Sequence, residues 1–389
     1  MMKLYVAGGC SEHGRNSFLV SGEHTTVLVD AGKMKEKPDK PFPELSEEVV
    51  RKVDYLFLTH SHTDHTGAIG FLKKLGFRGK IVASSATLNL IPELKGYETI
   101  ALKDRAVPGE EFFLEKDLAV TWGRAGHCVG SVWYSIRAEG RTVLFTGDYE
   151  EQSLAYDCDA IRGRRADLAV VDCAYGYEKE DAAEHWEALG AALDNLVHTD
   201  RPLLFPVPSH GRGFDVIRLL AERGVETVLT ESLIREYQDS TNREFWLKES
   251  FTDAVKKLKK RDIQDFRREF ETAIAEGKPF PESCRDTAIL VRDSQLVKEA
   301  NRHIAVGVEA MGGRTILTGK QDPASFARKL FNDGAADFFR ISVHQNIEEM
   351  RRLAGRNHFK KIVPYHCREK LTFPEKEIMV LEPGDSVEI

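Results

Sequence analysis

The feature that most constrains this chain is a polar loop directly behind a short apolar strand. Three histidines and an aspartate fall within six residues, His60-Ser61-His62-Thr63-Asp64-His65, after the apolar run Tyr55–Leu58. In an extended segment, residues two apart point the same way, so His60 and His62 can share one ion. Asp64 and His65, beyond the bend, can reach a second ion. Imidazole and carboxylate ligands without thiolates favour zinc. The loop therefore predicts a metal site at a strand end.

One loop cannot surround two ions, so further ligands must come from other segments. Three candidates stand at the ends of apolar runs: His127 in Ala-Gly-His, Asp148 in Thr-Gly-Asp, and Asp30 in Leu-Val-Asp-Ala-Gly. A single histidine or strand-end aspartate is more often a cap or turn residue than a ligand. Together with the loop, however, the three form an ordered set, which favours a shared site.

The organisation of the chain indicates one unit inserted into another. Short strands with interleaved helices precede Gly176, which predicts two sheets packed face to face and flanked by helices. The strands Leu203–Val207 and Val225–Leu229, separated by a helix, then indicate a parallel α/β unit. From about Asp337 the pattern of short strands with interleaved helices returns. We expect an outer unit of residues 1–175 plus 336–389 and an inserted unit of residues 176–335.

Composition names no function but limits the setting. At 42% hydrophobic and 30% charged residues the chain reads as globular, and no apolar run approaches the ~20 residues that span a bilayer. Neither a signal peptide nor a CxxC pair is present, so we expect a cytoplasmic protein without a membrane partner. The net charge of −7 weighs mildly against nucleic acid. Bound metal ions would outweigh that charge locally.

The series Leu-Val-Asp-Ala-Gly, His-Ser-His-Thr-Asp-His, Ala-Gly-His and Thr-Gly-Asp resembles the ordered motifs of the metallo-β-lactamase superfamily. The resemblance implies an α/β fold, the αββα sandwich of that superfamily. It assigns His60, His62 and His127 to one zinc ion, and Asp64 and His65 to a second. Asp148 would bridge both ions. Asp30 would orient the ligands from behind.

Three later motifs resemble the β-CASP branch, the RNA-cleaving metallo-ribonucleases in which a second α/β domain interrupts the sandwich. Val170–Gly176 resembles the acidic motif, Ile341–Asn346 the first histidine motif and Val363–His366 the second. The turn Gly8–Asn16 resembles the N-terminal turn of bacterial members, and His210-Gly211-Arg212 resembles a connecting signature. The likeness covers essentially the whole chain.

The branch resemblance implies a two-metal phosphodiesterase that cleaves single-stranded RNA by attack of a metal-bridging hydroxide. His344 would protonate the leaving oxygen, Asp172 would orient His344, and His366 would complete the second metal site. DNA-processing members tend to carry valine at that last position, so His366 indicates RNA. The implied roles are catalytic for Asp64, Asp172 and His344, and substrate-binding for Ser342, Gly211 and Arg212. The cofactors would be two zinc ions, with manganese as the alternative.

Several positions depart from the branch pattern, and rival functions stay open. Cys173-Ala174 replaces a Ser-Thr pair, Asn346 replaces an aspartate, Cys367-Arg368 replaces Gly-Glu, and His13 replaces an aliphatic residue. The rivals are a small-molecule ester or thioester hydrolase on the same metal core and an RNA-binding scaffold without activity. The sequence also leaves open endonucleolytic against 5′-exonucleolytic cleavage, and whether the chain forms an oligomer such as a dimer.

Overall fold

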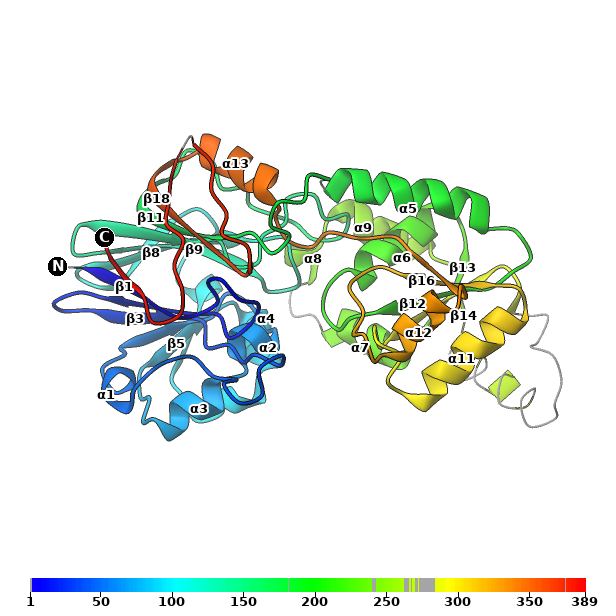
Figure 1. Cartoon of the computed structure of the whole chain (residues 1–389), viewed down its shortest axis with the longest axis horizontal. Helices are drawn as coiled ribbons and strands as arrows, with labels where there is room; N and C mark the ends of the chain where they lie inside the picture. Colours follow the sequence, from blue (N-terminus) through cyan, green and yellow to red (C-terminus); the bar gives the residue numbers. More distant parts are fainter. Residues whose placement is uncertain are drawn as a thin grey trace. The chain divides into compact units, whose positions relative to one another are not determined.

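The computed structural model describes residues 2–180, 182–239, 243–261, 266, 268–269, 272, 284–374 and 376–389. The chain divides into two compact units (Figure 1). Unit 1 comprises Met1–Glu151, Asp157–Asp181 and His344–Ile389, and unit 2 comprises Gln152–Tyr156 and Ala182–Val343. Unit 2 is therefore inserted into unit 1. The observed divisions lie a few residues beyond the expected ones, at 181/182 and 343/344.

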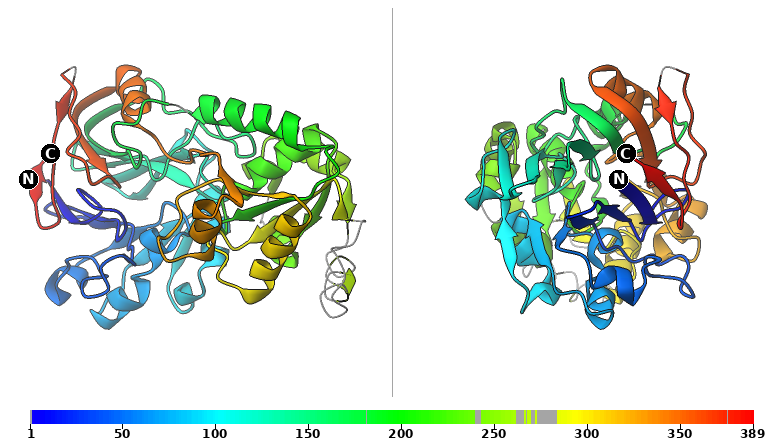
Figure 2. Two further views of the ribbon diagram at one scale, coloured as in Figure 1. Left: turned by 45° about the vertical axis from the view of Figure 1, so that its right-hand side comes forward. Right: turned by 90° about the vertical axis from the view of Figure 1, so that its left-hand side faces the viewer.

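Unit 1 contains two seven-stranded sheets, and the first is built from both ends of the chain. Its strand order is β20-β1-β2-β3-β4-β5-β6. Strand β20 pairs antiparallel with β1, so the two termini lie side by side (Figure 2). The bounds are β1 Lys3–Gly8, β2 Ser17–Ser21, β3 Thr26–Val29, β4 Tyr55–Phe57, β5 Lys80–Ala83, β6 Thr99–Ala101 and β20 Ser386–Glu388.

The second sheet joins segments from before and after the insertion, in the order β19-β18-β11-β10-β9-β8-β7. Strands β11 and β18 are parallel, with Asp172 opposite Tyr365. This register brings the acidic motif beside His366, although nearly two hundred residues of chain separate them. The bounds are β7 Glu111–Glu115, β8 Leu118–Arg124, β9 Val132–Ala138, β10 Arg141–Phe145, β11 Arg165–Asp172, β18 His358–Tyr365 and β19 Glu377–Ile378.

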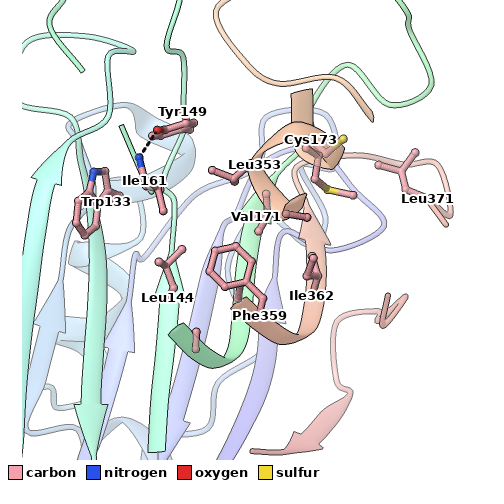
Figure 3. Close-up of a cluster of buried hydrophobic side chains, with 14 of the residues drawn as sticks. Trp133, Leu144, Tyr149, Ile161, Val171, Cys173, Leu353, Phe359, Ile362 and Leu371 are labelled. Atoms are coloured by element: carbon pink, nitrogen blue, oxygen red, sulfur yellow. Dashed lines mark hydrogen bonds between the residues drawn. The ribbon is translucent and has the colours of Figure 1, made fainter. Parts of the chain in front are cut away.

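Each sheet of unit 1 packs one face on the other sheet and one face on helices. Phe18 of the first sheet contacts Phe145 and Tyr365 of the second edge-on or tilted. On the outer faces, α1 and α3 lie against the first sheet and α13 against the second (Figure 1). Leu353 and Phe359 belong to the core beneath α13 (Figure 3). The helices are α1 Glu47–Val50, α2 Thr63–Thr66, α3 Ile69–Lys74, α4 Ser85–Leu90 and α13 Ile347–Gly355. The expected αββα sandwich is confirmed.

Unit 2 is a parallel α/β unit. Its sheet has the order β14-β13-β15-β12-β16-β17, with α5 over one face and α11 and α12 over the other (Figure 2). The expected strands β12 and β13 are parallel, but β15 lies between them. The bounds are β12 Leu203–Val207, β13 Glu226–Leu229, β14 Lys260–Arg261, β15 Thr287–Arg292, β16 Arg314–Leu317, β17 Ala336–Phe338, α5 Ala182–Leu196, α6 Gly213–Glu222, α7 Glu231–Asp239, α8 Arg243–Trp246, α9 Glu249–Lys257, α11 Glu299–Ala310 and α12 Phe326–Asn332. Within the described part of the chain, no helix has the length and apolarity to cross a bilayer.

Candidate metal centre

Three imidazoles of unit 1 converge in what we call the histidine group: His60, His62 and His127. His60 follows β4, His62 caps α2, and His127 stands in the turn after β8. Nδ1 of His62 lies 3.1 Å from Nε2 of His60 and 3.2 Å from Nε2 of His127. Two ring nitrogens that face each other at these distances cannot both carry a proton. The histidine group therefore directs nitrogen lone pairs toward a common point. Gly126 permits the turn, because a Cβ there would lie 2.0 Å from the Glu150 carbonyl oxygen.

A second set, the aspartate group, consists of Asp64, His65 and His366. Oδ2 of Asp64 lies 3.7 Å from Nε2 of His65 and 3.3 Å from Nε2 of His366. The helical spacing of apolar residues over Thr66–Leu75 predicts a helix there, and α3 occupies most of that range, but it begins only at Ile69 because α2 ends at Thr66. The amide of Ala68 bonds the Ala31 carbonyl instead of a helical partner. That break leaves α2 as a single turn that presents Asp64 and His65.

Asp148 joins the two groups. It follows β10, is 1% exposed, and directs one carboxylate oxygen to each group. Oδ2 lies 3.4 Å from Nε2 of His60 and 3.5 Å from Nε2 of His127. Oδ1 lies 3.1 Å from Nε2 of His65 and 3.4 Å from Nδ1 of His366. This is the arrangement required of a carboxylate shared by two ions.

Buried residues behind the ligands hold them in place. Asp30, with a φ of 61°, accepts hydrogen bonds from the Thr59 amide and hydroxyl at 2.8 Å and lies 2.7 Å from Nδ1 of His65. The Tyr365 hydroxyl donates to Oδ1 of Asp148 at 3.0 Å. Asp30 was expected behind the ligands, whereas Thr59 and Tyr365 were missed. Each directly precedes a histidine of a recognised motif, which is the signal that could have found them.

Asp172 and His344 form a pair beside Asp148. Oδ2 of Asp172 lies 3.1 Å from Nδ1 of His344. The carboxylate also accepts hydrogen bonds from the backbone amides of Tyr149 and Ala174. The His344 ring lies 4.8 Å from that of His127 and 4.9 Å from that of His366, between ring centroids. The structure therefore brings the expected acidic and histidine motifs to one place.

Opposing charges fix the protonation of the cluster. Burial raises the pKa of Asp148 and of Asp64, but the surrounding histidines hold both pKa values well below their usual range. Burial lowers the pKa of His65 and of His366, but the carboxylates around them raise both pKa values well above the usual range. The pKa of buried His60 falls well below its usual value. The carboxylates are therefore ionised and ready to bind a cation.

The donor set fits divalent metal ions. Within the described residues, three overlapping sets have ligand atoms that all lie within 4.8 Å of one another. They are His60, His62, His127 and Asp148; Asp64, His65, Asp148 and His366; and Asp148, Asp172, His344 and His366. All ligand atoms are imidazole nitrogens or carboxylate oxygens, a chemistry that suits zinc or a similar ion.

The remaining expected site residues, Ser342, Gly211 and Arg212, belong to unit 2. The Ser342 hydroxyl lies 2.6 Å from Nδ1 of His185, and both side chains are buried. Arg212 donates to the carbonyl oxygens of Thr318 and Ile341. Within unit 2 these contacts tie the His210-Gly211-Arg212 loop to the ends of neighbouring segments.

One departure from the branch pattern has a structural explanation. Asn346 caps α13, since its side-chain oxygen accepts hydrogen bonds from the amides of Glu348 and Glu349. Its amide group donates to the carbonyl oxygen of Glu180, which is a bond that an ionised aspartate could not make. Asparagine therefore ties the segment after the acidic motif to α13.

Comparison with known proteins identifies the family. The metallo-beta-lactamase superfamily profile matches residues 11–214, more than half of the chain. The chain therefore belongs to the metallo-β-lactamase superfamily, which confirms the resemblance seen in its motifs.

Relatives with assigned names match part of the chain. A transcription termination factor FttA of Methanosarcina mazei is 26% identical over 253 residues, covering 57% of this chain and 39% of the relative. An endoribonuclease ysh1 of Emericella nidulans is 24% identical over 250 residues, covering 57% of this chain and 28% of the relative. The chain thus spans well under half the length of either relative.

A solved structure shares the fold over the full chain. A protein of unknown function from Enterococcus faecalis aligns over 99% of both chains with a TM-score of 0.59 and 13% identity. At that identity the likeness shows the fold alone.

Proposed function

We propose that the protein is a two-metal ribonuclease of the β-CASP branch that cleaves single-stranded RNA. The observation that carries the proposal is the convergence, within unit 1, of two ligand groups on Asp148 with the Asp172–His344 pair beside them. The Emericella nidulans relative is an endoribonuclease, which supports RNA as the substrate class. The inserted unit 2 supports assignment of residues 176–335 as the β-CASP domain and of residues 1–175 plus 336–389 as the metallo-β-lactamase domain.

The proposed ligands divide as the geometry divides them. His60, His62 and His127 would hold one ion, Asp64, His65 and His366 would hold the other, and Asp148 would supply one carboxylate oxygen to each. Bound divalent ions would lower the pKa of a water molecule and neutralise charge that develops on phosphate oxygens. We assign zinc, because the ligands are nitrogen and oxygen, with manganese as the alternative.

The protein groups then supply orientation and a proton. Asp30 accepts from Nδ1 of His65, which leaves Nε2 of that ring free to bind metal. Asp172 accepts from Nδ1 of His344, so Nε2 of His344 is the atom that delivers a proton to the departing ribose oxygen. Ser342, Gly211 and Arg212 are proposed contacts of unit 2 with the RNA.

Two further assignments accompany this proposal. We also propose a cytoplasmic location, because all six cysteines are free thiols, the form that a reducing compartment maintains. We propose both endonucleolytic and 5′-exonucleolytic cleavage as modes to be tested, since the metal centre serves either.

The test compares three substrates with one zinc-loaded preparation. End-labelled single-stranded RNA, single-stranded DNA of the same sequence, and a chromogenic ester are incubated with the protein before and after chelation. Cleavage of RNA that chelation abolishes supports the proposal, and the sizes of the labelled products separate the endonucleolytic from the exonucleolytic mode. Turnover of the ester alone would instead indicate a small-molecule hydrolase. Binding of RNA without cleavage would indicate a scaffold.

A further inference from the structure

The N-terminal turn Gly8–Asn16 contacts every member of the aspartate group. The backbone amide of Asn16 donates to the Asp64 carbonyl oxygen at 2.9 Å, and the His366 amide donates to the Gly9 carbonyl oxygen at 2.7 Å. The side-chain nitrogen of Asn16 lies 2.8 Å from Nε2 of His65 and 3.5 Å from Oδ2 of Asp64. The turn is therefore part of the wall around one proposed ion.

Two glycines make this close approach sterically possible. A Cβ at Gly32 would lie 1.7 Å from the Asp64 carbonyl oxygen and 2.5 Å from the Asn16 amide nitrogen. A Cβ at Gly9 would lie 2.5 Å from Oδ1 of Asn16. Both positions therefore require glycine, and together they let Asn16 sit directly against Asp64. The side chain of Asn16 is 0% exposed.

The polar atoms of Asn16 are unequally satisfied. Within the described part of the chain, Oδ1 of Asn16 has no hydrogen-bond partner, although it is fully buried. Leaving such an acceptor unpaired in the protein interior is unfavourable. The side-chain nitrogen lies 2.8 Å from Nε2 of His65, which is the atom that would bind metal. An ion bound to Nε2 of His65 would leave that atom unable to accept a hydrogen bond from the Asn16 nitrogen, while Oδ1 of Asn16 would still lack a partner.

The distances match those between ligands of a single ion. Ligand atoms about 2.1 Å from one zinc ion lie roughly 3.0–3.4 Å from each other. The polar end of Asn16 lies 2.8 Å and 3.5 Å from two ligand atoms of the aspartate group. A half-turn of the carboxamide exchanges its two ends with little change in shape, which would present Oδ1 to the ion.

We propose that the carboxamide oxygen of Asn16 is a further ligand of the ion held by Asp64, His65 and His366. Amide oxygens are accepted ligands of hard divalent cations. The proposed ligand sets of the two ions then differ, because only the ion of the aspartate group would have a carboxamide ligand. This inference rests on the proposed metal centre and adds a ligand to one half of it.

The test measures metal binding rather than activity. Metal-free protein is titrated with zinc against a competing chelator, and bound zinc is counted by elemental analysis. Asn16→Ala is expected to bind one ion as tightly as the wild type and the second about 10–100-fold more weakly. Asn16→Asp, which keeps an oxygen in place, is expected to bind both ions within a few-fold of the wild type. Asn16→Ser serves as a second truncation if the alanine variant does not fold.

A matched control comes from the other half of the centre. Ser131 is 1% exposed, and its hydroxyl oxygen accepts hydrogen bonds from the amides of His127 and Cys128. In an Asp64→Ala background, Asn16→Ala should cause no further loss of zinc binding, because both substitutions affect the same ion. Ser131→Ala should lower zinc binding further in that background, because it affects the ion of the histidine group.

Several outcomes would overturn the inference. Wild-type affinity for both ions in Asn16→Ala, with only a lower unfolding midpoint of the metal-free protein, would make Asn16 purely structural. Equal loss in Asn16→Ala and Asn16→Asp would show that the amide acts as a donor to Asp64 and not as a ligand. A wild-type protein that binds no zinc would refute the metal centre itself, and Asn16 with it.

Discussion

The two halves of the metal centre are built from the chain in different ways. The histidine group lies within the first 127 residues, and two of its three members share one loop. The aspartate group is closed only by His366, which follows β18 after the whole insertion. The first half is thus a local property of the sandwich. The second requires that the chain return from unit 2 and pair β18 with β11.

The halves also differ in charge. The histidine group consists of imidazoles alone, whereas Asp64 adds a carboxylate to the other half, and Asp30 stands behind His65. More carboxylates around one position bind a dication more tightly but also retain protons on the neighbouring histidines. We therefore expect the two ions to differ in affinity and in their response to pH.

The largest expected effect comes from removing the ligand that the two halves share. Asp148→Asn keeps the shape but loses the charge that faces both groups. We expect loss of both ions and a fall in RNA cleavage of about 10⁴-fold or more, since metal-dependent activation of water is then lost. Elemental analysis and initial rates measure the two losses. Retention of two zinc ions per chain would show that Asp148 does not join the halves.

Asp64→Ala should affect zinc binding in only one of the two halves. Asp64 belongs to one ligand group alone, so we expect one zinc ion to be retained and one to be lost, with RNA hydrolysis abolished. The ratio of zinc to protein, measured by elemental analysis after gel filtration, checks this. An unchanged ratio would contradict the ligand assignment, and a ratio near zero would mean that the histidine group cannot hold an ion alone.

His344→Ala should leave zinc binding by both halves unchanged and remove the proposed general acid. His344 pairs with Asp172 and shares only one ligand set, so zinc content should stay at the wild-type value. Removal of a general acid lowers the rate by about 10²–10⁴-fold. Single-turnover cleavage of labelled RNA measures this. Near-normal turnover would remove His344 from the mechanism.

The sequence predicted the histidine group more completely than its surroundings. His60 and His62 share a loop and a strand-end spacing that alone indicate metal binding. His366 and His344 carry no such spacing, and only the family motifs connected them with the site. Their positions depend on the parallel pairing of β11 with β18, a long-range register that local patterns do not encode.

The supporting residues were the least predictable. Tyr365 is a polar residue at the end of a strand, Asn16 is one at the end of a turn, and nothing in their spacing indicates a ligand partner. Their role follows from burial at the end of one strand against another. The helix predicted over residues 66–75 is present as α3 but starts later than predicted, because the backbone amide of Ala68 donates to the Ala31 carbonyl oxygen and so overrides local helix propensity at that point.

Tyr365→Phe should lower the zinc affinity of both halves, but less than removal of a ligand does. The lost hydroxyl donates to Oδ1 of Asp148, so the shared carboxylate loses one of the contacts that orient it. Removing such a supporting hydrogen bond lowers metal affinity by about 10–100-fold. Competitive zinc titration measures this change. Since Tyr365 is buried and phenylalanine has nearly its shape, the metal-free unfolding midpoint serves as the control and should move little.

The smallest effect concerns pH and the metal-free protein. The folded-state pKa values of His65 and His366 lie well above the ~6.5 of an unfolded histidine, because the buried carboxylates beside them outweigh burial. Between pH 6.5 and 8 the folded state therefore binds more protons than the unfolded state, so stability falls as pH rises. Zinc competes with these protons for the same nitrogens, so zinc affinity should rise over the same window. Thermal unfolding at several pH values, with and without zinc, measures both trends. A metal-free midpoint that rises from pH 6.5 to 8 would mean that the carboxylates do not hold protons on the aspartate group, and the contrast in charge between the two halves would be lost.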